Sequence, residues 1–249
     1  MPELPPTTWP RPFVLEKGTT RALHFAEDEV QSRMDVREPH ALHLAYTRMM
    51  MGFLLFVPNP ASLCMIGLGG GSLAKFCYRH LPRTAITVIE INPYVIALRD
   101  SFQVPADSAR FRVEEADGAA FLRETTQRYD VLMVDAYDET GMPAPLATQR
   151  FFDDCRGALS AEGMLVVNLH ADHPHHTVHV DRIRRSFDGA VLVVDDTARD
   201  NRIVFAENGR TPTALALGPL RRPQALDEPA WRSLQASFAR ILATWKDAR

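Results

Sequence analysis

From residue 61 onward, short apolar segments alternate along the chain with segments of helical periodicity, and this alternation constrains the fold more than any other feature. The strand-like segments that precede helical ones are residues 62–67, 85–91, 111–115, 130–135 and 164–169, and most of them are apolar. Strands that are apolar throughout are buried on both faces, as in a parallel sheet covered by helices. Two further strand-like segments, 190–194 and 202–206, are joined by a polar turn that suits an antiparallel hairpin. We predict an α/β fold, with a Rossmann-like, doubly wound, seven-stranded sheet and an antiparallel last strand.

The residues before this alternation have a different pattern. Turn signals separate three short segments rich in β-forming residues, which are residues 13–16, 21–25 and 29–33. They predict a small antiparallel β-meander, and a helix is expected over residues 41–56, ended by a Pro-Asn-Pro sequence. We therefore expect residues 1–60 to hold the N-terminal β-meander and a connecting helix, and residues 61–249 to hold the Rossmann-like domain.

Charge balance and cysteine content argue against several classes of protein. Lys and Arg number 28 against 31 Asp and Glu, so the chain has no excess of cations for a broad nucleic-acid surface. Cys64, Cys77 and Cys155 are odd in number and far apart, which disfavours disulfides and indicates a reduced, cytoplasmic setting. The longest apolar run, residues 49–57, is too short to cross a bilayer, and the N-terminus has no apolar signal core. We expect no nucleic-acid partner and no membrane association.

A glycine-rich turn follows the first strand of the sheet. Gly67, Gly69 and Gly70 are part of the sequence GLGGGS, which leads directly into a helix. Glycines at such a turn let the backbone approach a ligand closely, although they also occur for packing alone. The turn is no Walker loop, because no Gly-Lys-Ser/Thr follows, and Ser72 replaces the third glycine of a dinucleotide fingerprint.

Acidic residues follow the next two strands, where ligands of such sheets bind. Glu90 ends the second strand and could accept both hydroxyls of a ribose, or it could stabilise the start of the next helix. Asp117 ends the third strand and could accept from an adenine amino group, or it could be the N-cap of its helix.

Two aspartates, Asp135 and Asp138, follow the fourth strand at the centre of the sheet. Their place next to the glycine turn favours a role in chemistry over a role in packing. The alternative is that they only form a turn, since aspartate side chains accept hydrogen bonds from nearby backbone amides.

The order of these features resembles class I S-adenosylmethionine-dependent proteins, and within that group the spermidine synthase family of polyamine aminopropyltransferases. The resemblance covers roughly residues 14–205. Its most specific stretch is YDVLMVDAYD at residues 129–138, followed by Gly141, Leu146 and the pair 151–152, which is similar to the family's YDVIIVDSSDP…L…FY segment.

Shorter motifs extend the resemblance to the nucleoside site. Residues 66–72 are similar to the family's IGGGDGG turn, 88–92 to its VEID strand, and 116–118 to its GDG. The resemblance implies that Glu90 binds the ribose and that Asp117, with Gly118 beside it, binds the adenine. Gln31 resembles the glutamine of the family's IQ strand, which lies near the nucleoside cofactor.

The resemblance also implies a reaction and its components. Asp135 would be the catalytic acid/base, and Asp138 would lie near the acceptor amine. The chain would transfer an aminopropyl group from decarboxylated S-adenosylmethionine to a small amine acceptor, as a homodimer. Five histidines within residues 170–179 are expected to form a solvated loop and helix start, and we expect no metal.

Three departures from the family pattern keep other functions open. Gly70 stands where the family's glycine turn has an acid, Pro is missing after Asp138, and the family's Tyr-His pair has no clear counterpart near residues 37–44. These positions help to hold the aminopropyl group and the acceptor. The alternatives are a methyltransferase that uses intact S-adenosylmethionine, and a non-catalytic nucleoside-binding relative.

Overall fold

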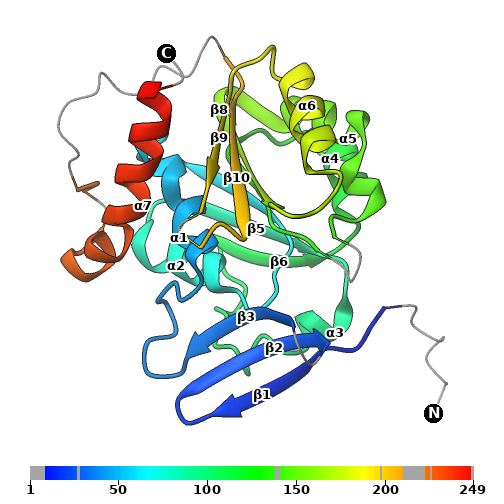
Figure 1. Cartoon of the computed structure of the whole chain (residues 1–249). Helices are drawn as coiled ribbons and strands as arrows, with labels where there is room; N and C mark the ends of the chain where they lie inside the picture. The colour runs from blue at the N-terminus through cyan, green and yellow to red at the C-terminus, as the bar shows by residue number, and fades with distance from the viewer. Residues whose placement is uncertain are drawn as a thin grey trace.

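The computed structural model describes residues 9–26, 29–137, 141–196, 198–209, 222–224 and 226–247. Its strands form a large seven-stranded sheet and a small three-stranded sheet (Figure 1). The strand order in the large sheet is β6-β5-β4-β7-β8-β10-β9. The strands are β4 (Ser62–Ile66), β5 (Ala85–Glu90), β6 (Phe111–Glu115), β7 (Tyr129–Val134), β8 (Leu159–His170), β9 (Val191–Asp195) and β10 (Asn201–Glu207).

The pairing within the large sheet confirms the fold that we predicted. The pairs between β6, β5, β4, β7 and β8 are all parallel, whereas β10 is antiparallel to both of its neighbours. Ile66 at the end of β4 pairs with Ile89 of β5 and with Val134 of β7. This register brings the glycine turn, Glu90 and Asp135 to one edge of the sheet.

Helices cover both faces of the large sheet, because alternate residues of each strand face opposite sides. In β4, Leu63 and Met65 belong to one apolar cluster, and Cys64 and Ile66 belong to another. The first cluster includes residues of α1 (Ala45–Met50), the 3-10 helix η1 (Met51–Leu55), α2 (Ser72–His80), α3 (Pro93–Ile96) and α7 (Glu228–Asp247). The second includes residues of α4 (Gly118–Glu124), the 3-10 helix η2 (Ala144–Ala147), α5 (Gln149–Ala158) and α6 (His176–Ser186).

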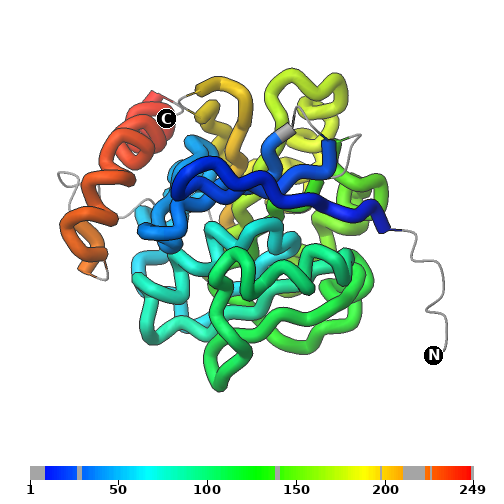
Figure 2. Tube along the Cα trace, turned by 90° about the horizontal axis from the view of Figure 1, so that it is seen from below, coloured from blue at the N-terminus to red at the C-terminus, as the bar shows by residue number. Residues whose placement is uncertain are grey.

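The small sheet is the N-terminal β-meander expected from the sequence. It consists of β1 (Phe13–Lys17), β2 (Thr20–Ala26) and β3 (Glu29–Asp35), paired antiparallel in that order. Leu23 and Met34 bury their side chains in the first apolar cluster, so the meander is packed onto the larger part of the molecule. Figure 2, viewed from the meander's side, shows β1 to β3 lying across the molecule.

One helix is shorter than we predicted. The helix expected over residues 41–56 begins only at Ala45 and tightens into η1 after Met50. Its start is delayed because the Arg48 guanidinium binds the carbonyls of Leu42 and His43, which keeps these residues in a non-helical conformation. Turns follow α3 and end at Gln103, which has a positive φ of 54°.

None of the helices in the described residues is both long and apolar enough to span a membrane.

Candidate active site

A cavity of about 1090 Å³ lies at the carboxyl ends of the parallel strands, beneath the β-meander. It is lined by most of the residues that the sequence singled out, namely Gln31, Gly67, Gly69, Glu90, Asp117, Gly118 and Asp135. Asp138 lies outside the described residues. The cavity therefore brings together side chains and backbone from strand ends that are far apart in the sequence.

The glycine turn connects three of these strand ends. The amide of Gly67 donates to the carbonyl of Ile89 at 2.8 Å, and the amide of Asp135 donates to the carbonyl of Ile66 at 3.0 Å. Gly67 has a φ of +98°, and a Cβ atom there would overlap the carbonyl oxygen of Asp135. Only glycine fits this position without strain, because both its backbone conformation and its contact exclude a side chain.

Gly70, unlike Gly67 and Gly69, is not among the residues that line the cavity. A Cβ atom on Gly70 would lie 2.6 Å from the Ser32 hydroxyl oxygen and 2.9 Å from a ring carbon of Phe102. Ser32 comes from β3 and is 6% exposed, and Phe102 is 1% exposed. These two buried side chains occupy the space that an acidic side chain at position 70 would need.

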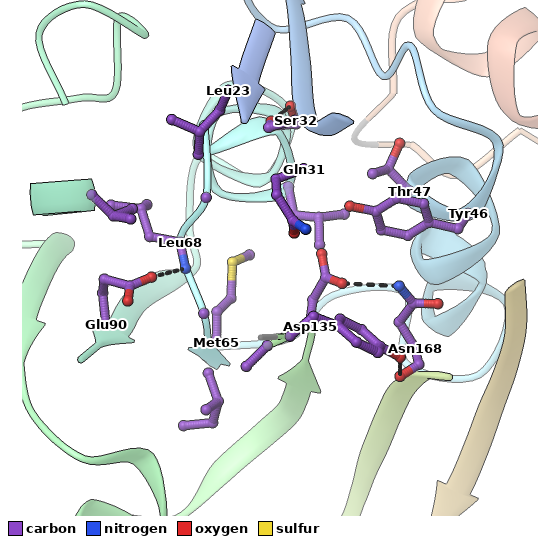
Figure 3. Close-up of a pocket in the computed structure, with 18 of the residues that line it drawn as sticks. Leu23, Gln31, Ser32, Tyr46, Thr47, Met65, Leu68, Glu90, Asp135 and Asn168 are labelled. Atoms are coloured by element: carbon purple, nitrogen blue, oxygen red, sulfur yellow. Dashed lines mark hydrogen bonds between the residues drawn. The ribbon is translucent and has the colours of Figure 1, made fainter. Parts of the chain in front are cut away.

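Glu90 is buried at the tip of β5 and is held by backbone amides. One carboxylate oxygen accepts from the Leu68 amide at 2.9 Å (Figure 3), and the other accepts from the Asn92 amide at 2.8 Å. Burial raises the pKa of Glu90, and the backbone hydrogen bonds oppose that rise. Backbone hydrogen bonds from Ile91 and Gly69 also favour the charged carboxylate, so its orientation in the cavity lining is fixed from several sides.

Asp117 is the N-cap of α4. Its side chain accepts from the Ala120 amide at 2.9 Å, so the helix-capping alternative holds for this residue. The same carboxylate lines the cavity, next to Gly118. One oxygen is used by the cap, and the other can accept from a ligand.

Asp135 lies on the opposite side of the cavity from Glu90 (Figure 3). Its Oδ1 accepts from the side-chain amide of Asn168 in β8 at 3.0 Å. Burial raises the pKa of Asp135 from 3.8 to about 6, although hydrogen bonds from Asn168 and Tyr46 favour the charged form. A carboxyl group with this pKa is ionised near neutral pH and is a stronger base than an exposed aspartate.

Two tyrosines lie near Asp135 that we did not predict as site residues from the sequence. Tyr46, from α1, points its hydroxyl at Asp135 (Figure 3), and burial together with the Asp135 charge raises the pKa of the phenol. Tyr137 donates to the carbonyl of Asn168, and its ring stacks on His170 with 4.1 Å between the ring centres. Tyr46 lies just beyond residues 37–44, where the family's Tyr-His pair has no counterpart, and no motif marks Asn168.

The remaining histidines of residues 170–179 lie along the start of α6. His173 stands against Gly141, and its ring centre lies 6.2 Å from that of His179. His179 is 5% exposed, and burial lowers its pKa to about 4. Within the described part of the chain, no three His, Cys, Asp or Glu side chains are arranged to hold a metal ion.

The sequence of this chain is similar to those of known proteins. The model of the spermine/spermidine synthase domain matches residues 43–194. A polyamine aminopropyltransferase from Neisseria meningitidis serogroup A is 38% identical over 200 residues, which cover 80% of this chain and 76% of that protein. This agrees with the resemblance seen in the sequence.

Two solved structures share the fold. A spermidine synthase in complex with the transition-state analogue AdoDATO has a TM-score of 0.68 and 19% identity, covering 92% of this chain and 85% of that one. Human methyltransferase-like protein 13 in complex with SAH has a TM-score of 0.61 and 23% identity, covering 80% of this chain and 93% of that one. The match to the family model and the identity to the Neisseria protein lead to one conclusion: the chain belongs to the spermine/spermidine synthase family.

Proposed function

We propose that this protein is a polyamine aminopropyltransferase, which transfers an aminopropyl group from decarboxylated S-adenosylmethionine to a small amine acceptor. The observation that carries the proposal is the partly buried carboxylate of Asp135, which shares one cavity with Glu90 and the glycine turn. A base and a nucleoside site in one cavity are what this displacement reaction needs.

The nucleoside of the donor binds at the ends of β4, β5 and β6. Glu90 accepts the ribose hydroxyls, a role supported by the fixed orientation of its carboxylate and by its place in the cavity lining. Asp117 accepts from the adenine amino group, beside Gly118. Gly67 and Gly69 let the backbone approach the ligand, and Gln31 reaches into the cavity from β3 above Asp135 (Figure 3).

In the reaction, the lone pair of a neutral acceptor amine attacks the carbon next to the sulfonium. A nitrogen–carbon bond forms, the carbon–sulfur bond breaks, and its electron pair leaves on sulfur as neutral methylthioadenosine. The positive charge thus moves from sulfur to nitrogen, and the new ammonium group then loses a proton. Asp135 is placed to orient the amine, stabilise its developing charge and accept this proton.

The groups around Asp135 support this role. Asn168 and Tyr46 donate hydrogen bonds that favour the ionised carboxylate, while burial raises its affinity for a proton. Asp138 helps to bind the acceptor amine, a role that rests on the sequence alone. Neither the attack of the amine nor the loss of its proton requires a metal.

A methyltransferase that uses intact S-adenosylmethionine is the second candidate. It is favoured by Gly70, whose neighbours Ser32 and Phe102 leave no space for the acid of the family's glycine turn. Without that acid, the negative charge that would repel the carboxylate of intact S-adenosylmethionine is missing.

Two measurements separate these candidates. Calorimetry should show tighter binding of decarboxylated than of intact S-adenosylmethionine, with methylthioadenosine also bound; the reverse preference would favour the methyltransferase. Incubation with decarboxylated S-adenosylmethionine and linear diamines should release methylthioadenosine and give an amine heavier by one aminopropyl group. If none of the three nucleosides binds, the chain is a non-catalytic member of the family.

We also propose that the protein is a cytoplasmic homodimer. The three cysteines are buried and unpaired, which suits a reducing compartment. β1 is an edge strand of the meander, and its Leu15 is 50% exposed, which suits burial against a second copy. Light scattering should give the dimer mass at concentrations on the order of tens of micromolar, as expected for a tight dimer. A monomer at that concentration contradicts this assembly.

A further inference from the structure

Trp9 lies at the nucleoside end of the cavity, although it is far from Glu90 in the sequence. Its side chain lines the same cavity as Glu90 and Asn92. It is 38% exposed and is one of three large apolar side chains that are exposed in the described residues. A large aromatic ring that is partly open to a cavity offers a surface for an aromatic or apolar part of a ligand.

Two anchors hold the backbone next to Trp9 against the rim of the cavity. The carbonyl of Pro10 accepts from the side-chain amide of Asn92 at 2.9 Å. The Arg11 guanidinium lies 4.5 Å from the centre of the Tyr94 ring and donates to the Tyr94 hydroxyl at 3.2 Å. We call residues 9–11 the N-terminal strap.

Asn92 connects this strap directly to Glu90. Its backbone amide donates to the Glu90 carboxylate at 2.8 Å, its side-chain oxygen caps α3 by accepting from the Tyr94 amide at 2.9 Å, and its side-chain nitrogen binds Pro10. Asn92 itself is buried, with 4% of its surface exposed. Asn92 therefore both anchors the strap and helps to orient Glu90.

We propose that Trp9 is a donor-binding residue, whose indole packs on the nucleoside of the bound donor. This inference rests on the proposed function of the nucleoside site. Glu90 supplies polar contacts at the rim of the cavity, and Trp9 supplies an aromatic surface beside them. Stacking on an aromatic side chain stabilises a bound base without any hydrogen bond, because every base has a π-face.

Tryptophan fluorescence tests the contact, because the chain has three tryptophans and Trp9 alone among them lines the cavity. Trp231 and Trp245 are buried in α7 and are each 6% exposed. Adding methylthioadenosine to the full chain should change the emission, and Trp9→Phe should abolish this change. Trp245→Phe is the matched control and should retain it.

Calorimetry with methylthioadenosine measures the contribution to binding. Trp9→Ala should weaken affinity about tenfold, within the range reported for loss of a stacked aromatic ring, and Trp9→Phe should stay within about threefold of the wild type. In steady-state assays Trp9→Ala should raise the KM for the donor more than it lowers kcat. Circular dichroism checks that each variant is folded.

The outcomes separate this inference from the proposed function. If the wild type binds methylthioadenosine and Trp9→Ala binds it equally well, Trp9 is not a donor-binding residue while the proposed function stands. An emission change of full size in Trp9→Phe has the same consequence. If the wild type does not bind methylthioadenosine, the nucleoside site and the role of Trp9 are both wrong.

Discussion

Replacing Asp135 with asparagine changes the proposed base while keeping the size of its side chain. The amide cannot accept the proton of the acceptor amine, and it cannot stabilise the developing positive charge. Loss of a general base lowers the rate by about 10²-fold to 10⁴-fold, so we expect kcat to fall by at least about 10²-fold. Affinity for methylthioadenosine should change much less, because Glu90 and Asp117 remain.

The pH dependence follows from the raised pKa of Asp135, which is about 6. The carboxyl group becomes a base only as the pH rises through 6, so wild-type activity should fall when the pH drops below that value. At higher pH the rate should continue to rise as the acceptor amine, with a pKa of roughly 10 in water, loses its proton. In the pH–rate profile of Asp135→Asn, the rise near pH 6 should be absent, and the rise at higher pH that is due to the acceptor amine should remain.

The same pKa predicts an effect on stability. The carboxyl group has a reference pKa of 3.8 and holds its proton more tightly in the folded state, so between pH 4 and 6 the folded state binds more protons than the unfolded state. Stability from this group is therefore present below pH 4 and is lost as the pH rises to about 6. The full loss is on the order of 3 kcal/mol, because each pKa unit corresponds to about 1.4 kcal/mol.

Urea unfolding of both proteins at pH 4.5 and pH 7.5 measures this effect, and stopped assays of methylthioadenosine release measure kcat. Asp135→Asn should lose less stability than the wild type between the two pH values. A folded Asp135→Asn variant with turnover within threefold of the wild type would refute the assignment of Asp135 as the base. If the rise in rate near pH 6 is unchanged in that variant, it is caused by the titration of another group.

Four further predictions concern neighbouring residues. Glu90→Gln should weaken methylthioadenosine binding by about 1.5–3 kcal/mol in calorimetry, because a charge-assisted acceptor is lost; unchanged affinity contradicts the ribose contact. Asp138→Asn should mainly raise the KM for the amine, and a fall in kcat alone would instead place this residue in the chemical step. Gly67→Ala should cost about 2 kcal/mol or more in urea unfolding, since the Cβ meets the Asp135 carbonyl at a positive φ; wild-type stability would contradict this contact. Tyr46→Phe removes a hydrogen bond that lowers the pKa of Asp135, so the acid limb of the pH–rate profile should move to higher pH, and a limb that stays in place argues against that bond.

Local sequence patterns were sufficient for the order of strands and helices and for the acids at the strand ends. Glu90 ends one strand and Asp117 and Asp135 follow two others, and parallel strands bring their carboxyl ends to one edge. Their meeting in one cavity therefore follows from the topology. The predicted start of the helix over residues 41–56 was wrong, because the Arg48 side chain binds the backbone carbonyls of Leu42 and His43, which precede α1.

The sequence by itself determined the fold class, the family and the strand-end residues, because these depend on periodicity and on motifs that are short along the chain. Only the tertiary structure placed Tyr46 and Asn168 beside Asp135, filled the space at Gly70 with Ser32, and set Trp9 at the cavity rim. These contacts join residues from different elements. Their geometry depends on how helices and the β-meander pack onto the sheet, and no local pattern encodes that packing.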